Sequence, residues 1–166
     1  MRKVLFVFGQ LSDADVDWLA KNGRRKRLAK STVLIHEGVA VETFYILIDG
    51  ELLVTQGKPA RQLARLGSGE IAGEMSFVDT RPPSATVSAA TDVVVCAIPT
   101  DKLGKALAEN LGFSSRFYKA VATFLSDRLR RATDRDYDDE LDDSVLDNVD
   151  RAGARFHALS RALMDG

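Results

Sequence analysis

The chain has 166 residues, of which 45% are hydrophobic and 28% charged, a balance typical of a soluble globular protein and unlike that of a disordered or fibrous chain. The 23 Lys and Arg residues nearly cancel the 24 Asp and Glu residues and leave a net charge of −1, which argues against a surface built to attract nucleic acid or an anionic membrane. Cys96 is the single cysteine, and no apolar stretch approaches the ~20 residues of a membrane helix, so we expect a cytoplasmic protein without disulfides.

Residues 1–23 predict a short strand or turn followed by a helix. Ser12 is a residue type that caps helices, Asp15 would lie in the first turn, and the pattern ends at Gly23. One face of this helix would be apolar, with Val16, Leu19 and Ala20.

In residues 24–99 the hydrophobic pattern changes to a period of two residues, which predicts many short strands. The strand-like runs are 32–36, 43–48, 51–55, 61–66, 85–90 and 93–98. Asp49-Gly50, between two of these runs, is a strong hairpin signal, and the alternation in 61–66 points Leu63 and Leu66 inward. Short strands at even spacing favour a sandwich, barrel or jelly roll.

From Thr100 onward the pattern is helical. Thr100 is a candidate N-cap for a helix through Glu109, and a longer helix is expected over 114–131, with an apolar stripe of Phe117, Val121, Phe124 and Leu125. An acidic run over 134–150 leads into an amphipathic tail helix. Its apolar residues are Leu141, Val145, Val149, Ala152, Phe156, Leu159 and Leu163. Gly153 costs such a helix about 1 kcal/mol, so we expect the stripe to be buried on a partner subunit or on another protein.

A glycine-rich segment over 67–77, followed by 79–86, carries the candidate chemistry. Glycines let the backbone approach a ligand closely, and a short helix starting near Gly73-Glu74 would point free N–H groups at an anion. The Glu74 carboxylate could accept hydrogen bonds from sugar hydroxyls, and Ser84 and Thr86 would add hydroxyl groups on the far side of the loop.

Gly73-Glu74-Met75, followed by Pro82 and by Ser84-Ala85-Thr86-Val87, resembles the phosphate-binding cassette of cyclic-nucleotide-binding domains. This family includes catabolite activator protein and the regulatory subunits of cyclic-AMP-dependent kinase, and the likeness covers about residues 10–132. The resemblance implies a mainly β fold with flanking α-helices: an antiparallel β-roll, also described as a double-stranded β-helix or jelly roll, with an N-terminal helix and C-terminal helices. It also implies that the long helix dimerises two copies.

The resemblance implies roles for individual residues. Glu74 would bind the ribose 2′-hydroxyl, and N–H groups after Gly73 would face the cyclic phosphate of cyclic AMP or cyclic GMP, with no other cofactor required. The family's phosphate-binding arginine is replaced here by Pro83, which has neither charge nor N–H. Arg81 lies two positions earlier and is the nearest candidate substitute. The ligand-binding candidates are thus Gly73, Glu74, Met75, Ser76, Arg81, Ser84, Ala85 and Thr86.

Other site types fit the sequence poorly. Gly67, Gly69 and Ala72 imitate a dinucleotide fingerprint, but Pro82-Pro83 excludes the long helix that this fingerprint needs. The two histidines, His36 and His157, do not cluster as the metal ligands of a jelly-roll enzyme would.

The sequence also does not favour a catalytic nucleophile, a calcium-binding loop or a nucleic-acid-binding surface. Cys96 lies in an apolar run, and no nucleophile is paired with a base, so we expect no enzymatic activity. The acidic run has Asp139 and Val145 where a calcium loop needs Gly and Glu. A basic cluster is expected to be a solvated strand edge rather than a DNA-binding surface. Its members are Lys21, Arg24, Arg25, Lys26, Arg27 and Lys30.

Two functions remain open. The first is a regulatory module in which residues 1–132 bind a cyclic nucleotide and signal through the C-terminal helices, with 133–166 as an acidic connector and tail helix. No helix-turn-helix pattern follows, so the signal would pass to a protein partner, with homodimerisation expected. The alternative is a degenerate domain that binds no nucleotide, because of Pro83, and acts as a dimeric protein-interaction scaffold.

Overall fold

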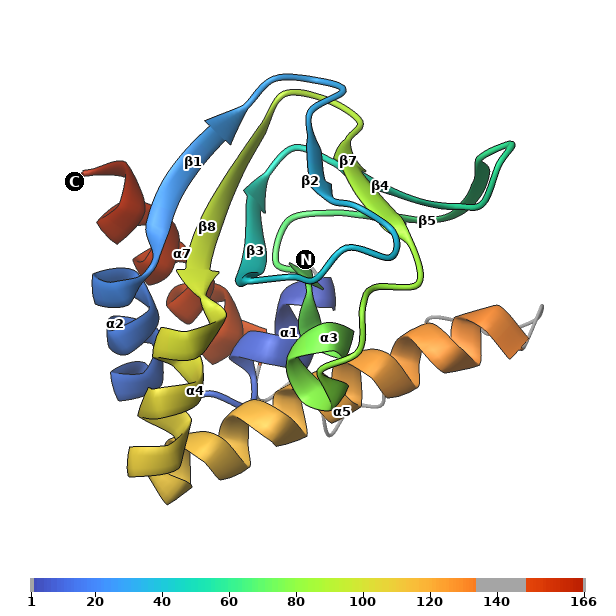
Figure 1. Ribbon diagram of the computed structural model, residues 1–166. Helices are drawn as coiled ribbons and strands as arrows, with labels where there is room; N and C mark the ends of the chain where they lie inside the picture. The colour runs from blue at the N-terminus through green and yellow to red at the C-terminus, as the bar shows by residue number, and fades with distance from the viewer. Residues whose placement is uncertain (1, 134–148, 166) are drawn as a thin grey trace.

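The computed structural model describes residues 2–133 and 149–165. Eight strands form two four-stranded antiparallel sheets that fold over each other as a roll (Figure 1). One sheet has the order β1-β8-β3-β6 and the other β2-β7-β4-β5. The strands are β1 (Arg24–Leu28), β2 (Val33–Ile35), β3 (Thr43–Asp49), β4 (Leu52–Gln56), β5 (Arg61–Leu66), β6 (Ile71–Ala72), β7 (Thr86–Ala89) and β8 (Val93–Pro99). The mainly β, antiparallel roll expected from the sequence is confirmed.

The sheet containing β3 and β8 is buried on both faces. On β8, Val93 and Val95 face the other sheet, while Cys96 and Ile98 face the helices. A strand covered on both sides needs apolar residues at every position, which explains the unbroken apolar run along β8. Burial raises the pKa of the Cys96 thiol to about 12, so this thiol is an inert part of the core.

Helices cover the outer face of that sheet. They are α1 (Arg2–Phe8), α2 (Asp13–Asn22), α3 (Glu74–Asp79), α4 (Thr100–Glu109), α5 (Leu111–Thr133) and α7 (Val149–Met164). The long helix α5 runs beneath the roll, with α3 between them (Figure 1). The carboxylate of buried Asp15 in α2 accepts two hydrogen bonds from Arg116 of α5, of 2.6 and 3.0 Å, so an ion pair ties these two helices together.

A chain of aromatic side chains runs from α3 to α2. The ring of Phe77 lies 5.6 Å from that of Phe117, which lies 6.2 Å from Phe113, which in turn lies 5.5 Å from Trp18. Phe44 of β3 contacts both Phe77 and Phe117. Aromatic pairs at these separations pack closely and favourably, so α3, α5 and α2 share one rigid contact network.

Four local expectations are wrong. The Asp49-Gly50 turn joins β3 to β4 without forming a hairpin, because the chain crosses there from one sheet to the other: β3 pairs with β6 and β8, and β4 with β5 and β7. Residues 2–8 form α1 rather than a strand or turn, because Val4, Val7 and Phe8 are buried on the helical core. Leu63 is 45% exposed while Leu66 is buried, because Leu66 lies opposite buried Leu52 of β4, whereas Leu63 falls at a register shift in this pairing and side chains alternate between the two faces of a strand. Thr100 is the first residue of α4 and Pro99 is its N-cap, with no side-chain cap bond.

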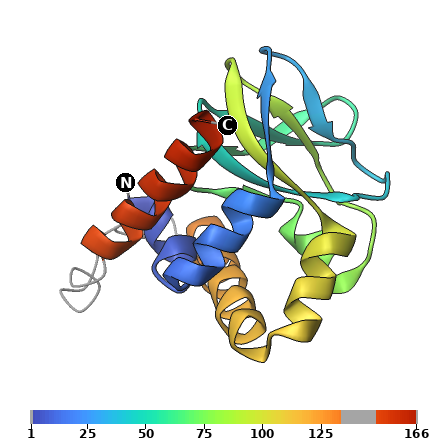
Figure 2. The ribbon, with the colours of Figure 1, turned by 90° about the vertical axis from the view of Figure 1, so that its left-hand side faces the viewer.

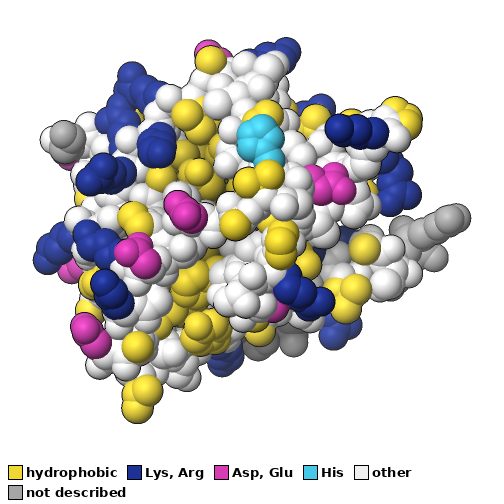
Figure 3. All heavy atoms as spheres, in the orientation of Figure 1, with side chains coloured by type: hydrophobic (Ala, Val, Ile, Leu, Met, Phe, Trp, Pro, Cys, Tyr) yellow, Lys and Arg dark blue, Asp and Glu magenta, His cyan; other side chains and the backbone are white. Residues whose placement is uncertain are grey.

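The other boundaries agree more closely. The capping box of Ser12 and Asp15 opens α2 as expected, and the long helix begins at Leu111, three residues before the expected start. The β1 strand lies at a sheet edge with Arg24, Lys26 and Arg27 exposed, and Lys and Arg side chains gather on that side of the molecule (Figure 3). The basic cluster is therefore the solvated strand edge that the sequence predicted.

The tail helix α7 packs on its own chain, lying across α1 and α2 (Figure 2). Ala152, Leu159 and Leu163 are buried there, and Arg25 donates hydrogen bonds to the last carbonyls of the helix, at Leu163 and Met164. The expectation that this stripe is buried on another subunit or protein is thus corrected, because the N-terminal helices supply the covering surface. The acidic run and the start of the stripe, over 134–148, lie outside the described residues, and the division at residues 132 and 133 stays a prediction.

In residues 2–133 and 149–165, no helix is both long enough and apolar enough to cross a bilayer.

Candidate functional site

The glycine-rich segment forms a sharp turn into a short helix. Gly73 has a φ of +89°, and a Cβ at this position would lie 2.9 Å from the carbonyl oxygen of Thr43, so a side chain would be strained as well as crowded. Glu74 begins α3, whose first N–H groups lack partners within the helix, as at every helix N-terminus. The turn therefore leaves backbone donors without helical partners at the start of α3, beside Glu74.

The facing wall is the segment that leads into β7. The Pro83 carbonyl accepts a hydrogen bond from the Gly38 N–H at 2.8 Å, and the Ser84 carbonyl accepts one from the Gln56 side chain at 2.8 Å. The Thr86 hydroxyl accepts a hydrogen bond from the N–H of Glu37 at 3.1 Å. These bonds from two separate loops hold the wall in place.

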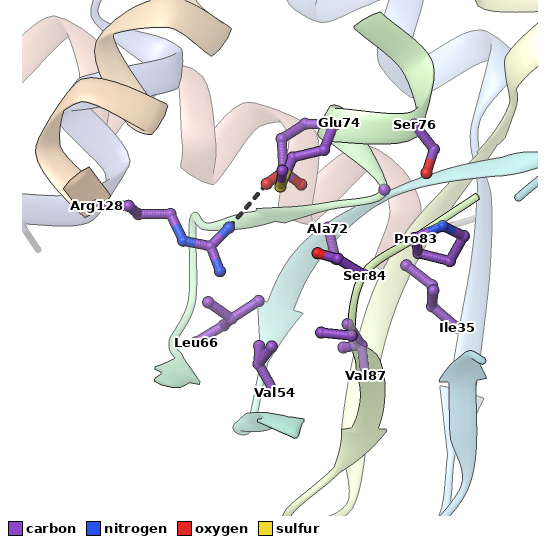
Figure 4. Close-up of a pocket in the computed structure, with 13 residues that line it drawn as sticks. Ile35, Val54, Leu66, Ala72, Glu74, Ser76, Pro83, Ser84, Val87 and Arg128 are labelled. Atoms are coloured by element: carbon purple, nitrogen blue, oxygen red, sulfur yellow. Dashed lines mark hydrogen bonds and ion pairs between the residues drawn. The ribbon is translucent and has the colours of Figure 1, made fainter. Parts of the chain in front are cut away.

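A pocket that is open to solvent lies between the turn and this wall (Figure 4). Its floor is apolar and comes from strands of the second sheet and β6: Ile35, Val54, Leu66, Ala72 and Val87. The hydroxyl of Ser84 points into the pocket (Figure 4). An apolar floor with a few convergent polar groups is typical of a small-molecule site.

The charged groups of the pocket pair with each other. Arg128 reaches in from α5, and its Nη1 donates a hydrogen bond of 2.7 Å to Oε1 of Glu74 (Figure 4). The Glu74 side chain is 4% exposed and that of Arg128 is 27% exposed. Burial raises the pKa of the Glu74 carboxyl above its usual range, and the Arg128 guanidinium offsets only part of this rise. The guanidinium also lies 5.2 Å above the Phe124 ring.

The net charge of the pocket follows from this pair. Among the described residues that line it, Glu74 and Arg128 are the charged ones, and their charges cancel. Glu70 lies close enough to act on Glu74 electrostatically, and its own carboxylate accepts a hydrogen bond of 2.6 Å from the Gly67 N–H. An anionic ligand would therefore enter a site without a surplus cation.

The structure brings together six of the eight candidate ligand-binding residues. Those lining the pocket are Gly73, Glu74, Met75, Ser76, Ser84 and Ala85. Thr86 does not line it, because its hydroxyl is turned toward Glu37. Arg81 does not line it either: its side chain is 81% exposed and forms a 2.8 Å ion pair with Asp79.

Arg128 is the charged pocket residue that the sequence analysis did not identify. A carboxylate placed in a cassette over an apolar floor needs a cation, which was a usable signal. Basic residues are frequent near the end of α5, however, and Arg128, Arg130 and Arg131 all lie within one turn. Which of them reaches Glu74 depends on how α5 docks against α3.

Comparison with known proteins assigns the family. The family model for the cyclic nucleotide-binding domain matches residues 25–110, and the chain belongs to this family.

Regulatory proteins are among the relatives. The cAMP-dependent protein kinase regulatory subunit of Yarrowia lipolytica is 34% identical over 70 residues, which cover 42% of this chain and 19% of that protein; the matched segment thus spans about a fifth of this curated relative. The N-terminal domain of a transcriptional regulator from Streptomyces coelicolor A3(2) is 27% identical, with a TM-score of 0.63 over 81% of this chain and 98% of that one. A cyclic nucleotide-binding domain from Methylobacillus flagellatus KT has a TM-score of 0.72 at 23% identity, over 85% of this chain and 84% of that one.

Proposed function

We propose that this protein is a non-enzymatic regulatory module whose pocket binds a cyclic nucleotide and whose α5 helix transmits the bound state. The observation that carries the proposal is the position of Glu74, which is turned into the pocket beside Gly73 and bonded directly to Arg128 of α5. Family membership and the regulatory nature of the relatives support it. In this proposal the Glu74 carboxylate accepts a hydrogen bond from the ribose hydroxyl. The N–H groups after Gly73 and the hydroxyl of Ser84 face the phosphate.

The transmission step rests on the Glu74–Arg128 bond. A ribose hydroxyl that hydrogen-bonds to Glu74 competes with Arg128 for the same carboxylate, so ligand binding changes what holds α5 against the roll. Such a ligand shifts a two-state equilibrium only by its difference in affinity between the two arrangements, and a nearly complete shift needs about 5.5 kcal/mol.

The test is a thermal-shift titration with cyclic AMP, cyclic GMP and cyclic di-GMP at millimolar concentrations. A ligand present at 100 times its dissociation constant stabilises a protein by about 2.7 kcal/mol, which for a chain of this size raises the melting temperature by roughly 5–11 °C. The companion variant Pro83→Arg restores the family's phosphate contact and is expected to bind more tightly. If this variant folds and still ignores all three ligands, the cassette assignment is wrong.

A second function, the dimeric scaffold that binds no nucleotide, is favoured by three observations. Pro83 occupies the place of the phosphate arginine, and the pocket's charges already cancel. Leu111, Tyr118 and Leu129 of α5 are 82%, 44% and 64% exposed, which suits a surface that pairs two copies. A monomer in sedimentation equilibrium, or stabilisation by a cyclic nucleotide, would each contradict this second function.

A further inference from the structure

The following inference rests on the proposed function: if the pocket binds a cyclic nucleotide, a positive charge must neutralise the cyclic phosphate. The ligand carries one negative charge, and Pro83 offers no cation. Arg81 is paired with Asp79 outside the pocket. Of the described residues lining the pocket, Arg128 is the basic one.

We propose that Arg128 of α5 is the phosphate-binding cation of this protein, and that it leaves Glu74 for the cyclic phosphate when the nucleotide binds. This would place the phosphate contact on the long helix rather than in the cassette loop.

The geometry of the pocket supports the transfer. Arg128 enters from one side and the hydroxyl of Ser84 points in from the wall opposite (Figure 4), so a phosphate held between these two side chains would contact both. Arg128 donates its hydrogen bond to Glu74 through Nη1, while a guanidinium can hold a phosphate through two parallel bonds. The exchange therefore replaces a single-pronged contact with a two-pronged one.

Charge balance gives the transfer a measurable consequence. Once Arg128 pairs with the phosphate, the Glu74 carboxylate is buried without its cation. It faces the carboxylate of Glu70, while the strands beneath contribute uncharged Val54, Leu66 and Val87. Burial already raises the pKa of Glu74 in the free protein, so loss of Arg128 raises it further. Glu74 then takes a proton from solvent, and as a neutral acid it still hydrogen-bonds the ribose hydroxyl.

The charges in the pocket sum to zero before and after this exchange. Before binding they are Glu74 minus and Arg128 plus; afterwards they are phosphate minus, Arg128 plus and neutral Glu74. Nucleotide binding is thus accompanied by uptake of about one proton, and the affinity falls by about tenfold per pH unit across the window in which free Glu74 is ionised.

The first experiment is calorimetric titration of the full chain with cyclic AMP between pH 5.5 and 8.5, in buffers of different ionisation enthalpy. The expected result is uptake of about one proton near neutral pH. In Glu74→Gln, which imitates the neutral acid, binding is expected to be independent of pH and at least as tight as in the wild type at pH 8.

The second experiment removes the cation without leaving a buried charge unpaired. In the Glu74→Gln background, Arg128→Gln is expected to weaken cyclic AMP binding by about 10- to 150-fold and to leave binding of adenosine, which has no phosphate, unchanged. Adding Pro83→Arg to this double variant is expected to restore cyclic AMP binding. The control is Arg130→Gln, an exposed residue of the same helix that does not line the pocket.

The outcomes separate the inference from the proposed function. Wild-type binding without proton uptake, or equal cyclic AMP affinity with and without Arg128 in the Glu74→Gln background, overturns the inference while the nucleotide-binding function stands. If neither the wild type nor Pro83→Arg binds any cyclic nucleotide at any pH, the proposed function fails and the inference fails with it.

Discussion

Replacing Arg128 by methionine tests the buried ion pair through protein stability. The variant leaves the Glu74 carboxylate, 4% exposed in its side chain, without a cation, and such a truncation typically costs about 3–5 kcal/mol. The cost has an upper bound, because Glu74 can escape it by taking a proton in the folded state. From the ordinary Glu pKa of 4.5, that bound is about 4 kcal/mol at pH 7.5 and about 1.4 kcal/mol at pH 5.5.

The assay is urea unfolding of the wild type and Arg128→Met at both pH values. A pKa that is raised in the folded state means that folding binds protons, so the variant loses stability as the pH rises above the unfolded value. The double variant Glu74→Gln, Arg128→Met has no buried charge and is expected to recover most of the loss. Arg130→Met is the matched control. A loss below about 1 kcal/mol at pH 7.5, a loss independent of pH, or the same loss in the Glu74→Gln background would refute the reasoning.

Three further predictions concern stability. Burial raises the pKa of Asp15, but its hydrogen bonds to Arg116 and Ser12 outweigh burial and lower the pKa overall. In urea unfolding, the stability advantage of the wild type over Asp15→Asn should therefore shrink as the pH falls through about 4. A difference in stability that does not change with pH would contradict this prediction. Gly73→Ala should lower the melting temperature, because of its φ of +89° and the Thr43 carbonyl; an unchanged temperature would mean that the turn is not strained. Leu159→Ala should lower the free energy of unfolding by about 2–5 kcal/mol. Met164 is half-exposed, and Met164→Ala should lower it by less than about 0.5 kcal/mol. Similar small losses in both variants would show that α7 is not part of the folded unit.

The sequence predicted those elements whose local signals agree with their tertiary surroundings. The capping box at Ser12 and the turn at Gly73 are short-range patterns, and the structure has both. Asp49-Gly50 is also a turn, but which strands pair on either side of it is decided by distant partners, and β3 and β4 form no hairpin. It misled where burial depends on distant neighbours. The first residues fold as α1 because α5 and α7 supply a surface for them, and the exposure of Leu63 depends on the register in which β5 pairs with β4.

The candidate site shows the same division. The glycine and carboxylate of the turn are encoded within a few residues, and Glu74 lies in the pocket as expected. Its counter-charge comes from 54 residues further along the chain, so local spacing could not identify Arg128. The outward position of Arg81 follows from its pairing with Asp79, a contact that competes with any role in the pocket.

The aromatic chain that runs from Phe77 to Trp18 gives this molecule a built-in optical reporter. Trp18 is the single tryptophan, and its ring packs against Phe113 near the start of α5. From Phe113, two further ring contacts lead through Phe117 to Phe77 of α3, the short helix that borders the pocket. Indole emission responds to local polarity and packing, so a shift of α3 or α5 would change the fluorescence spectrum of the unlabelled protein. Excitation at this one site could therefore follow the motion in real time, without any engineered dye.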